Sequence, residues 1–199
     1  TIPDLAATAY FAWSVHLLGR IAGLVGKGAD APRFAGLFDA IRQAFCARFV
    51  RQDGRMEPES QSAYVLALAF DLLPAALRAP AAQFLVADIR ARGNHLATGF
   101  LGTPHLCRVL VEAGYLDVAY DLLLQESYPS WLYPLAHGAT TIWERWNGIE
   151  PDGTLFHPAM NSFNHYAYGA IGEFLYSTVA GLERAPGSAG FGRLLIRPR

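Results

Sequence analysis

The sequence has few charges, few cysteines and no spacing typical of a metal site. Only 17% of its 199 residues are charged, and 16 basic and 17 acidic side chains leave a formal net charge of −1. No run of Lys and Arg is present to bind a phosphate backbone, which argues against a nucleic-acid partner. With 52% apolar residues, the chain is too hydrophobic for a disordered protein and long enough for one domain with a sizeable core.

Neither the cysteines nor the apolar runs define a special site. Cys46 and Cys107 lie in apolar, helix-like patterns, so we expect two buried free thiols. No C-x-x-C or H-E-x-x-H spacing occurs, and we therefore expect no metal and no cofactor. Residues 6–18 are the most apolar stretch, but they contain His16 and precede Arg20, whereas a membrane span needs about 20 apolar residues. This pattern predicts a buried helix and no membrane partner.

Apolar residues recur at helical spacing along most of the chain and predict an all-α protein. Thr103 and Pro104 are typical of a helix start, with Thr as the cap and Pro in the first turn. The helices are apolar over broad faces, so they should pack on two sides, as in a layered ring of helical hairpins. No strand is expected before residue 191. The expected helices span residues 5–25, 32–49, 60–73, 79–92, 103–114, 115–126 and 166–180.

Residues 128–165 form a long loop of unusual composition. They hold three of the four tryptophans and three of the six histidines. Long irregular loops in compact domains are usually functional or disordered, and this one is too aromatic to be disordered. Aromatic and amide side chains can stack on a polyhydroxylated ligand and bind its hydroxyl groups. The loop is therefore the candidate site.

The most informative segment of this loop is residues 138–148. Here Glu144 lies between Trp143 and Trp146 and beside Arg145. Indole rings offer apolar faces to the C–H surface of a sugar, and a carboxylate beside them can take a proton from water. The alternative is that Glu144 pairs with Arg145 while the tryptophans belong to the core.

A second polar segment, residues 160–169, precedes the last expected helix. It contains Asn161, Asn164 and His165, followed by Tyr166 and Tyr168. Neutral donors and acceptors at a helix start can face a pocket and match sugar hydroxyls. Alternatively, one of the two asparagines caps the helix and His165 is a buried histidine with its hydrogen bonds satisfied.

Together these two segments resemble bacterial α-L-rhamnosidases. The most specific motif is Ala-Thr-Thr-Ile-Trp-Glu-Arg-Trp at residues 139–146, and Asn-His-Tyr-Ala follows at residues 164–167. Glu-Ser-Gln-Ser-Ala-Tyr at 59–64, Leu-Ala-Thr-Gly-Phe-Leu-Gly-Thr-Pro at 96–104 and Tyr-Pro-Ser-Trp at 128–131 extend the resemblance. It runs from about residue 5 to the end of the chain.

The resemblance implies an (α/α)6 barrel, a toroid of helical hairpins, that hydrolyses terminal α-L-rhamnosyl groups with inversion. Its partner would be a rhamnose-containing oligosaccharide or glycoside. Inverting enzymes use two carboxyl groups about 6.5–9.5 Å apart, one as acid and one as base. The base would be Glu144. The further candidates for binding the sugar are His165, Asn164, Trp131, Trp143 and Trp146.

The sequence departs from the family in one large respect. The family's general acid belongs to an Asp-Glu-Arg-Leu-Gly-Trp type motif, which is absent here. We therefore expect the base without the acid, and a chain that is inactive or nearly so by itself. The start without Met and the strand-like pattern of residues 192–199 suggest a piece of a longer protein. The localisation stays open between the bacterial cytoplasm and periplasm.

The resemblance also predicts two parts of the chain. Residues 1–185 would be a partial barrel, and residues 186–199 a linker and the first strand of a truncated β-sandwich. An incomplete ring would expose apolar helix faces, so we expect either a homo-oligomer or a missing N-terminal segment.

Two rival functions are open at this point. One is another glycosidase, or a polysaccharide lyase, on the same (α/α)6 barrel. The other is a non-catalytic helical-repeat interaction module, although no fixed repeat period is present.

Overall fold

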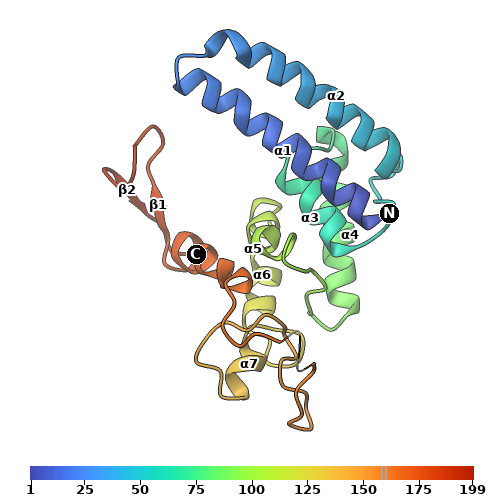
Figure 1. Ribbon diagram of the computed structural model, residues 1–199, viewed down its shortest axis with the longest axis vertical. Coiled ribbons are helices and arrows are strands. Elements are labelled where there is room, and N and C mark those ends of the chain that lie inside the picture. Colours follow the sequence, from blue (N-terminus) through green and yellow to red (C-terminus); the bar gives the residue numbers. More distant parts are fainter. Residues whose placement is uncertain (158, 160) are drawn as a thin grey trace.

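A computed structural model of the protein describes residues 1–157, 159 and 161–199. The helices are joined into hairpins that follow one another along the molecule, and the C-terminal strands extend away from them (Figure 1). The predicted all-α class and hairpin arrangement are confirmed. The paired helices are α1 (Ile2–Leu24) with α2 (Ala31–Phe49), α3 (Gln61–Ala69) with α4 (Ala75–Ala91), and α5 (Thr103–Glu112) with α6 (Leu116–Leu123).

Local sequence explains where several helices begin and end. The Thr1 hydroxyl accepts the N–H of Asp4 in a capping box at the start of α1. At the start of α3, the Ser60 hydroxyl accepts the N–H of Ala63 at 3.1 Å. Helix α3 is shorter than the predicted 60–73, because Asp71 adopts a left-handed backbone with φ 57° and turns the chain toward α4.

Helix α3 lies at the centre of the helical layers. It packs against α1, α4 and α5, and its residues 63–68 are all buried. Burial of a large apolar side chain stabilises a protein by about 1.5–3 kcal/mol, so a helix covered on all sides contributes much of the core. The prediction that broadly apolar helices pack on two sides is confirmed here.

The remaining helical elements are short. The short helix α7 (Leu132–Ala136) lies within the long loop of residues 128–165 and was not predicted. The predicted helix 166–180 is a continuous helical run of three geometries. It comprises the 3-10 turn η2 (Ala167–Ala170), the α-helix α8 (Ile171–Phe174) and the π-helical η3 (Leu175–Val179). Another 3-10 turn, η1 (Gly28–Asp30), joins α1 to α2.

The prediction of no strand before residue 191 is wrong. Strand β1 (Leu182–Arg184) pairs antiparallel with β2 (Leu194–Ile196), and Glu183 lies opposite Leu195. A strand this short carries too few residues for an alternating pattern to reveal it. The Glu183 carboxylate also lies 2.8 Å from the Arg197 guanidinium across the hairpin. This hairpin crosses the predicted division between residues 185 and 186, which stays a prediction.

We expect Gly181→Ala to open the C-terminal hairpin. Gly181 has φ +67°, and an added Cβ would collide with the backbone of Arg197 and Pro198. A side chain forced into such a backbone costs about 1–3 kcal/mol. Amide hydrogen exchange should show lost protection of β2. The control is Gly172→Ala in α8, where an added Cβ meets nothing within 4 Å. Equal protection of β2 in both variants would contradict the prediction.

Candidate active site

The two predicted polar segments lie side by side in the structure. The backbone N–H of Glu144 donates to the carbonyl of Ser162 at 2.8 Å, and the N–H of His165 donates to the carbonyl of Ile142 at 2.8 Å. These bonds join residues 142–144 to residues 162–165 in an antiparallel manner. Glu144 and His165, far apart in the sequence, are thereby held on neighbouring backbones.

The Glu144 carboxylate is half-buried and oriented by the same pairing. Its Oε2 atom accepts the backbone N–H of Ser162 at 2.9 Å. The neighbouring Arg145 guanidinium lies 4.6 Å from the centroid of the Phe156 ring, which is cation–π geometry. The local fold therefore presents one anchored carboxylate that keeps access to solvent.

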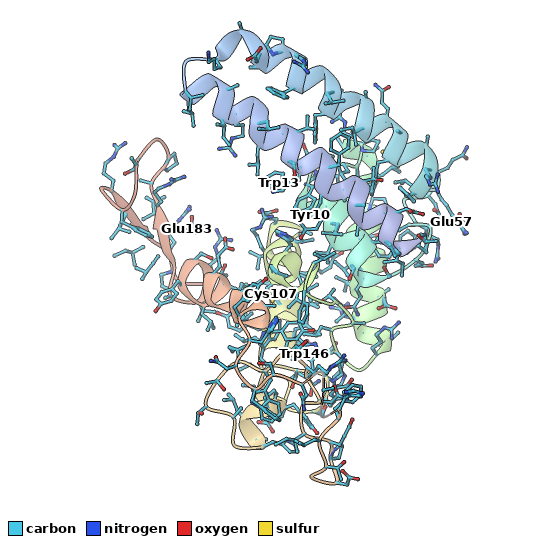
Figure 2. The ribbon with its side chains drawn as sticks, viewed as in Figure 1. Tyr10, Trp13, Glu57, Cys107, Trp146 and Glu183 are labelled. Atoms are coloured by element: carbon cyan, nitrogen blue, oxygen red, sulfur yellow. The ribbon has the colours of Figure 1, made fainter. Side chains whose placement is uncertain are left out.

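The three tryptophans form the support beneath this segment. Trp131, Trp143 and Trp146 are only 8%, 5% and 9% exposed. Trp146, labelled in Figure 2, stacks on Tyr168 at 3.7 Å between ring centroids and meets the edge of Trp131 at 5.3 Å. The Trp131 indole N–H donates to the Tyr168 carbonyl at 3.0 Å. The tryptophans are therefore packed as core residues, as the alternative interpretation predicted. Their contact with a ligand stays a prediction.

A mainly apolar cavity lies against these tryptophans. It has a volume of about 210 Å³ and is lined by the three indoles, Arg145, Tyr168 and apolar residues of α7 and α8. Glu144 is not among the residues that line it. The anchored carboxylate and this cavity are therefore separate features of one loop.

His165 is half-buried, and its ring is held by neighbours. Its Nδ1 atom accepts the N–H of Ala167 at 3.3 Å. Its ring is nearly parallel to Phe100, at 4.9 Å and 19°, and to Tyr166, at 5.1 Å and 17°. One imidazole nitrogen thus has its hydrogen bond, as expected for a histidine that serves the fold. The ring also keeps partial exposure at the surface.

The two asparagines differ in their surroundings. The Asn161 side-chain amide donates to the Gly148 carbonyl at 2.7 Å and ties the two segments together. Asn164 is exposed, and its backbone N–H donates to the Ser162 hydroxyl at 3.2 Å. The residue at the cap of η2 is Tyr166, with no side-chain capping bond. The capping alternative is therefore not what the structure shows.

Sequence reasoning missed two residues of this site. Ser162 orients Glu144 through its backbone, which no side-chain pattern reveals. Phe100 lies against the His165 ring, and it belongs to the glycine-rich segment 96–104 that carried the resemblance. An aromatic residue among glycines was the signal that could have found it.

The cysteines are free, and neither lies in the site. Cys107 is buried as predicted, and burial raises the pKa of its thiol to about 12. Cys46 is half-buried instead of buried, because its position on α2 borders solvent, and its thiol donates to the Leu72 carbonyl at 3.1 Å. Burial raises the pKa of this thiol too. Both are therefore protonated at neutral pH.

Residues 1–157, 159 and 161–199 contain neither a metal-ligand cluster nor a membrane-spanning helix. Within these ranges, no three His, Cys, Asp or Glu side chains are grouped to hold a metal ion. Over the same part of the chain, every helix is too short or too polar to cross a bilayer.

Stacked helical hairpins and a long loop with an anchored carboxylate are features that suit the class of six-hairpin glycosidases. Residues 1–179 match the model of the bacterial alpha-L-rhamnosidase six-hairpin glycosidase domain. The chain belongs to this family, as the resemblance implied.

Relatives of known activity and structure agree. The chain is 53% identical over its full length to an alpha-L-rhamnosidase of Streptomyces avermitilis and 43% identical to one of Formosa agariphila. The crystal structure of the Streptomyces avermitilis enzyme complexed with L-rhamnose superposes with a TM-score of 0.94 over 100% of this chain and 19% of that one. An alpha-L-rhamnosidase of Aspergillus terreus matches 89% of this chain and 21% of its own, at 35% identity and a TM-score of 0.86. The chain thus spans about a fifth of these enzymes.

Proposed function

We propose that this chain carries the water-activating side of an inverting α-L-rhamnosidase site, with Glu144 as the general base. The observation that carries the proposal is the backbone pairing that holds Glu144 beside the segment of His165. His165 and Asn164 would bind hydroxyl groups of the sugar. Trp131, Trp143 and Trp146 would support the site and wall its apolar side.

In this mechanism, Glu144 takes a proton from a water molecule as the water oxygen attacks the anomeric carbon. The bond to the leaving oxygen breaks on the opposite face, and a carboxylic acid protonates that oxygen. The anchoring N–H of Ser162 holds the base in one orientation and leaves its remaining lone pairs for water. The family's acid motif is absent from the sequence, so the acid would come from residues outside these 199.

The substrate class follows from the family and its relatives. All the relatives named above are described as alpha-L-rhamnosidases, and one of them is complexed with L-rhamnose. These matches favour rhamnosides over the substrates of other (α/α)6-barrel glycosidases and lyases. They also favour an enzyme over a helical-repeat interaction module.

The test is product analysis with the whole natural polypeptide that contains this chain. We expect cleavage of α-L-rhamnosides, no cleavage of the matched glucosides or uronides, and β-L-rhamnose as the first anomer in the proton NMR spectrum. The α-anomer appearing first would contradict inversion and leave the substrate class intact. Cleavage restricted to glucosides or uronides would favour the rival enzymes.

Gly148→Ala should impair the site without unfolding the helical layers. An added Cβ would lie 2.9 Å from Cε3 of Trp143 and 3.0 Å from Oδ1 of Asn161, so the two paired segments must shift. A misplacement of about 1 Å can lower a catalytic rate about 10²-fold. The measurement is kcat/KM on a nitrophenyl rhamnoside. Gly36→Ala in α2 is the control, since an added Cβ there meets nothing within 4 Å. Equal activity of both variants would contradict the tight packing.

A further inference from the structure

The loop of residues 93–102 carries part of the family resemblance but has no role in the mechanism above. Gln61, only 1% exposed, anchors its first half. The Gln61 side chain donates to Asp88 Oδ2 at 2.9 Å and to the His95 carbonyl at 3.2 Å, and it accepts the Ala97 N–H at 2.6 Å. A buried amide with its hydrogen bonds made is costly to displace. The geometry of this half of the loop therefore depends on one side chain of α3.

The second half of the loop is anchored independently. The buried hydroxyl groups of Thr98 and Thr103 lie 2.8 Å apart, and the Thr103 hydroxyl donates to the Gly99 carbonyl at 2.9 Å. Tyr10, labelled on α1 in Figure 2, donates its hydroxyl to the Leu101 carbonyl at 3.0 Å. Phe100 lies between these anchors, so its backbone has little freedom.

The side chain of Phe100 lies against His165, the candidate for sugar binding. The Phe100 ring lies 4.9 Å from the His165 ring at 19° and 5.1 Å from the Tyr168 ring at 52°. Since Nδ1 of His165 accepts the N–H of Ala167, the neutral imidazole carries its proton on Nε2. The ring stack and this single acceptor bond together determine where the Nε2–H group points.

We propose that Phe100 is a positioning residue that orients the imidazole of His165, so that its Nε2–H donates to a hydroxyl group of the bound sugar. This inference rests on the proposed function only for the identity of the acceptor. Phe100 acts through His165 and needs no contact with the sugar. The loop anchored by Gln61 and Thr103 is the support that gives the ring its position.

A double-mutant cycle in the whole natural polypeptide tests the proposal. Phe100→Leu should lower kcat/KM on a nitrophenyl rhamnoside about 3- to 10-fold, the effect of losing one aromatic pair. In a His165→Ala background, the same change should have no further effect, because coupled residues are not additive. Phe100→Tyr should keep wild-type activity, and Phe191→Leu, far from the site in sequence and exposed, is the control. Additive losses from Phe100→Leu and His165→Ala would overturn the proposal.

Nitrogen-15 NMR of the imidazole separates this inference from the proposed function. The wild type should show His165 with its proton on Nε2, and Phe100→Leu should show a mixture of both tautomers, with Phe100→Tyr restoring the single form. An unchanged tautomer in Phe100→Leu would overturn the positioning role whether or not the protein cleaves rhamnosides. A wild type that cleaves no rhamnoside would instead contradict the proposed function, and the tautomer would still test Phe100.

Discussion

Glu144→Gln should lower rhamnoside hydrolysis by the whole natural polypeptide about 10²–10⁴-fold, because the amide cannot take a proton from water. The amide has the same size as the carboxylate, and its oxygen can still accept the Ser162 N–H that orients Glu144. The fold and the affinity for rhamnose should therefore change little. The measurement is kcat on nitrophenyl and alkyl rhamnosides. Loss of a base should slow both substrates alike, whereas loss of an acid would spare the nitrophenyl substrate.

Two further variants make this prediction sharp. Glu126→Gln changes an exposed carboxylate outside the site and should keep full activity. Glu144→Ala leaves room for added azide, which should attack the anomeric carbon in place of water and form β-L-rhamnosyl azide. An azide product of α configuration would contradict a single inverting displacement. Full activity of Glu144→Gln would show that another group activates the water.

The 199-residue chain by itself should be almost inactive, although it carries the proposed base. The family's acid motif is absent from the sequence, so under the proposed mechanism no residue of this chain protonates the leaving oxygen. Loss of one acid or base commonly removes up to about 10⁴ in rate, and we expect at least this loss relative to the whole polypeptide. Release of L-rhamnose from an alkyl rhamnoside measures it, because the alkoxide leaving group needs a proton from the acid.

Calorimetry with L-rhamnose provides the control for this experiment. Weak binding by the isolated chain, lost in His165→Ala, would show a folded half-site without turnover. The same variant pair in the whole polypeptide gives the reference affinity. Release of L-rhamnose from the alkyl rhamnoside by the isolated chain, abolished by Glu144→Gln, would contradict the prediction, since it would place a complete acid and base pair within these residues.

Helices with strong periodicity were predictable to within a few residues, and the weakly patterned elements were not. The predicted helix 32–49 matches α2 closely, because its apolar stripe and its proline start are local features. Helix α7 and strand β1 were missed because each is too short to show a period. The early end of α3 depends on the left-handed Asp71, a backbone choice that its residue type permits without requiring.

The candidate site was predictable in its residues and not in its arrangement. The motif around Glu144 and the segment of His165 were recognisable from the order of their residues. The arrangement depends on contacts between distant positions. The two backbones pair, Ser162 orients the carboxylate, and Phe100 stacks on His165. No spacing rule reaches across such separations.

Residue order alone determined the helical class, the family and the presence of one carboxylate among indoles, because periodicity and motif are properties of neighbours along the chain. Folding decided which groups meet. Trp131 and Trp146 are drawn inward because burying large aromatic faces is favourable, and this leaves the polar edge of the loop at the surface. The position of Glu144 beside His165 was likewise decided by the tertiary structure, since it rests on backbone hydrogen bonds between segments distant in the sequence.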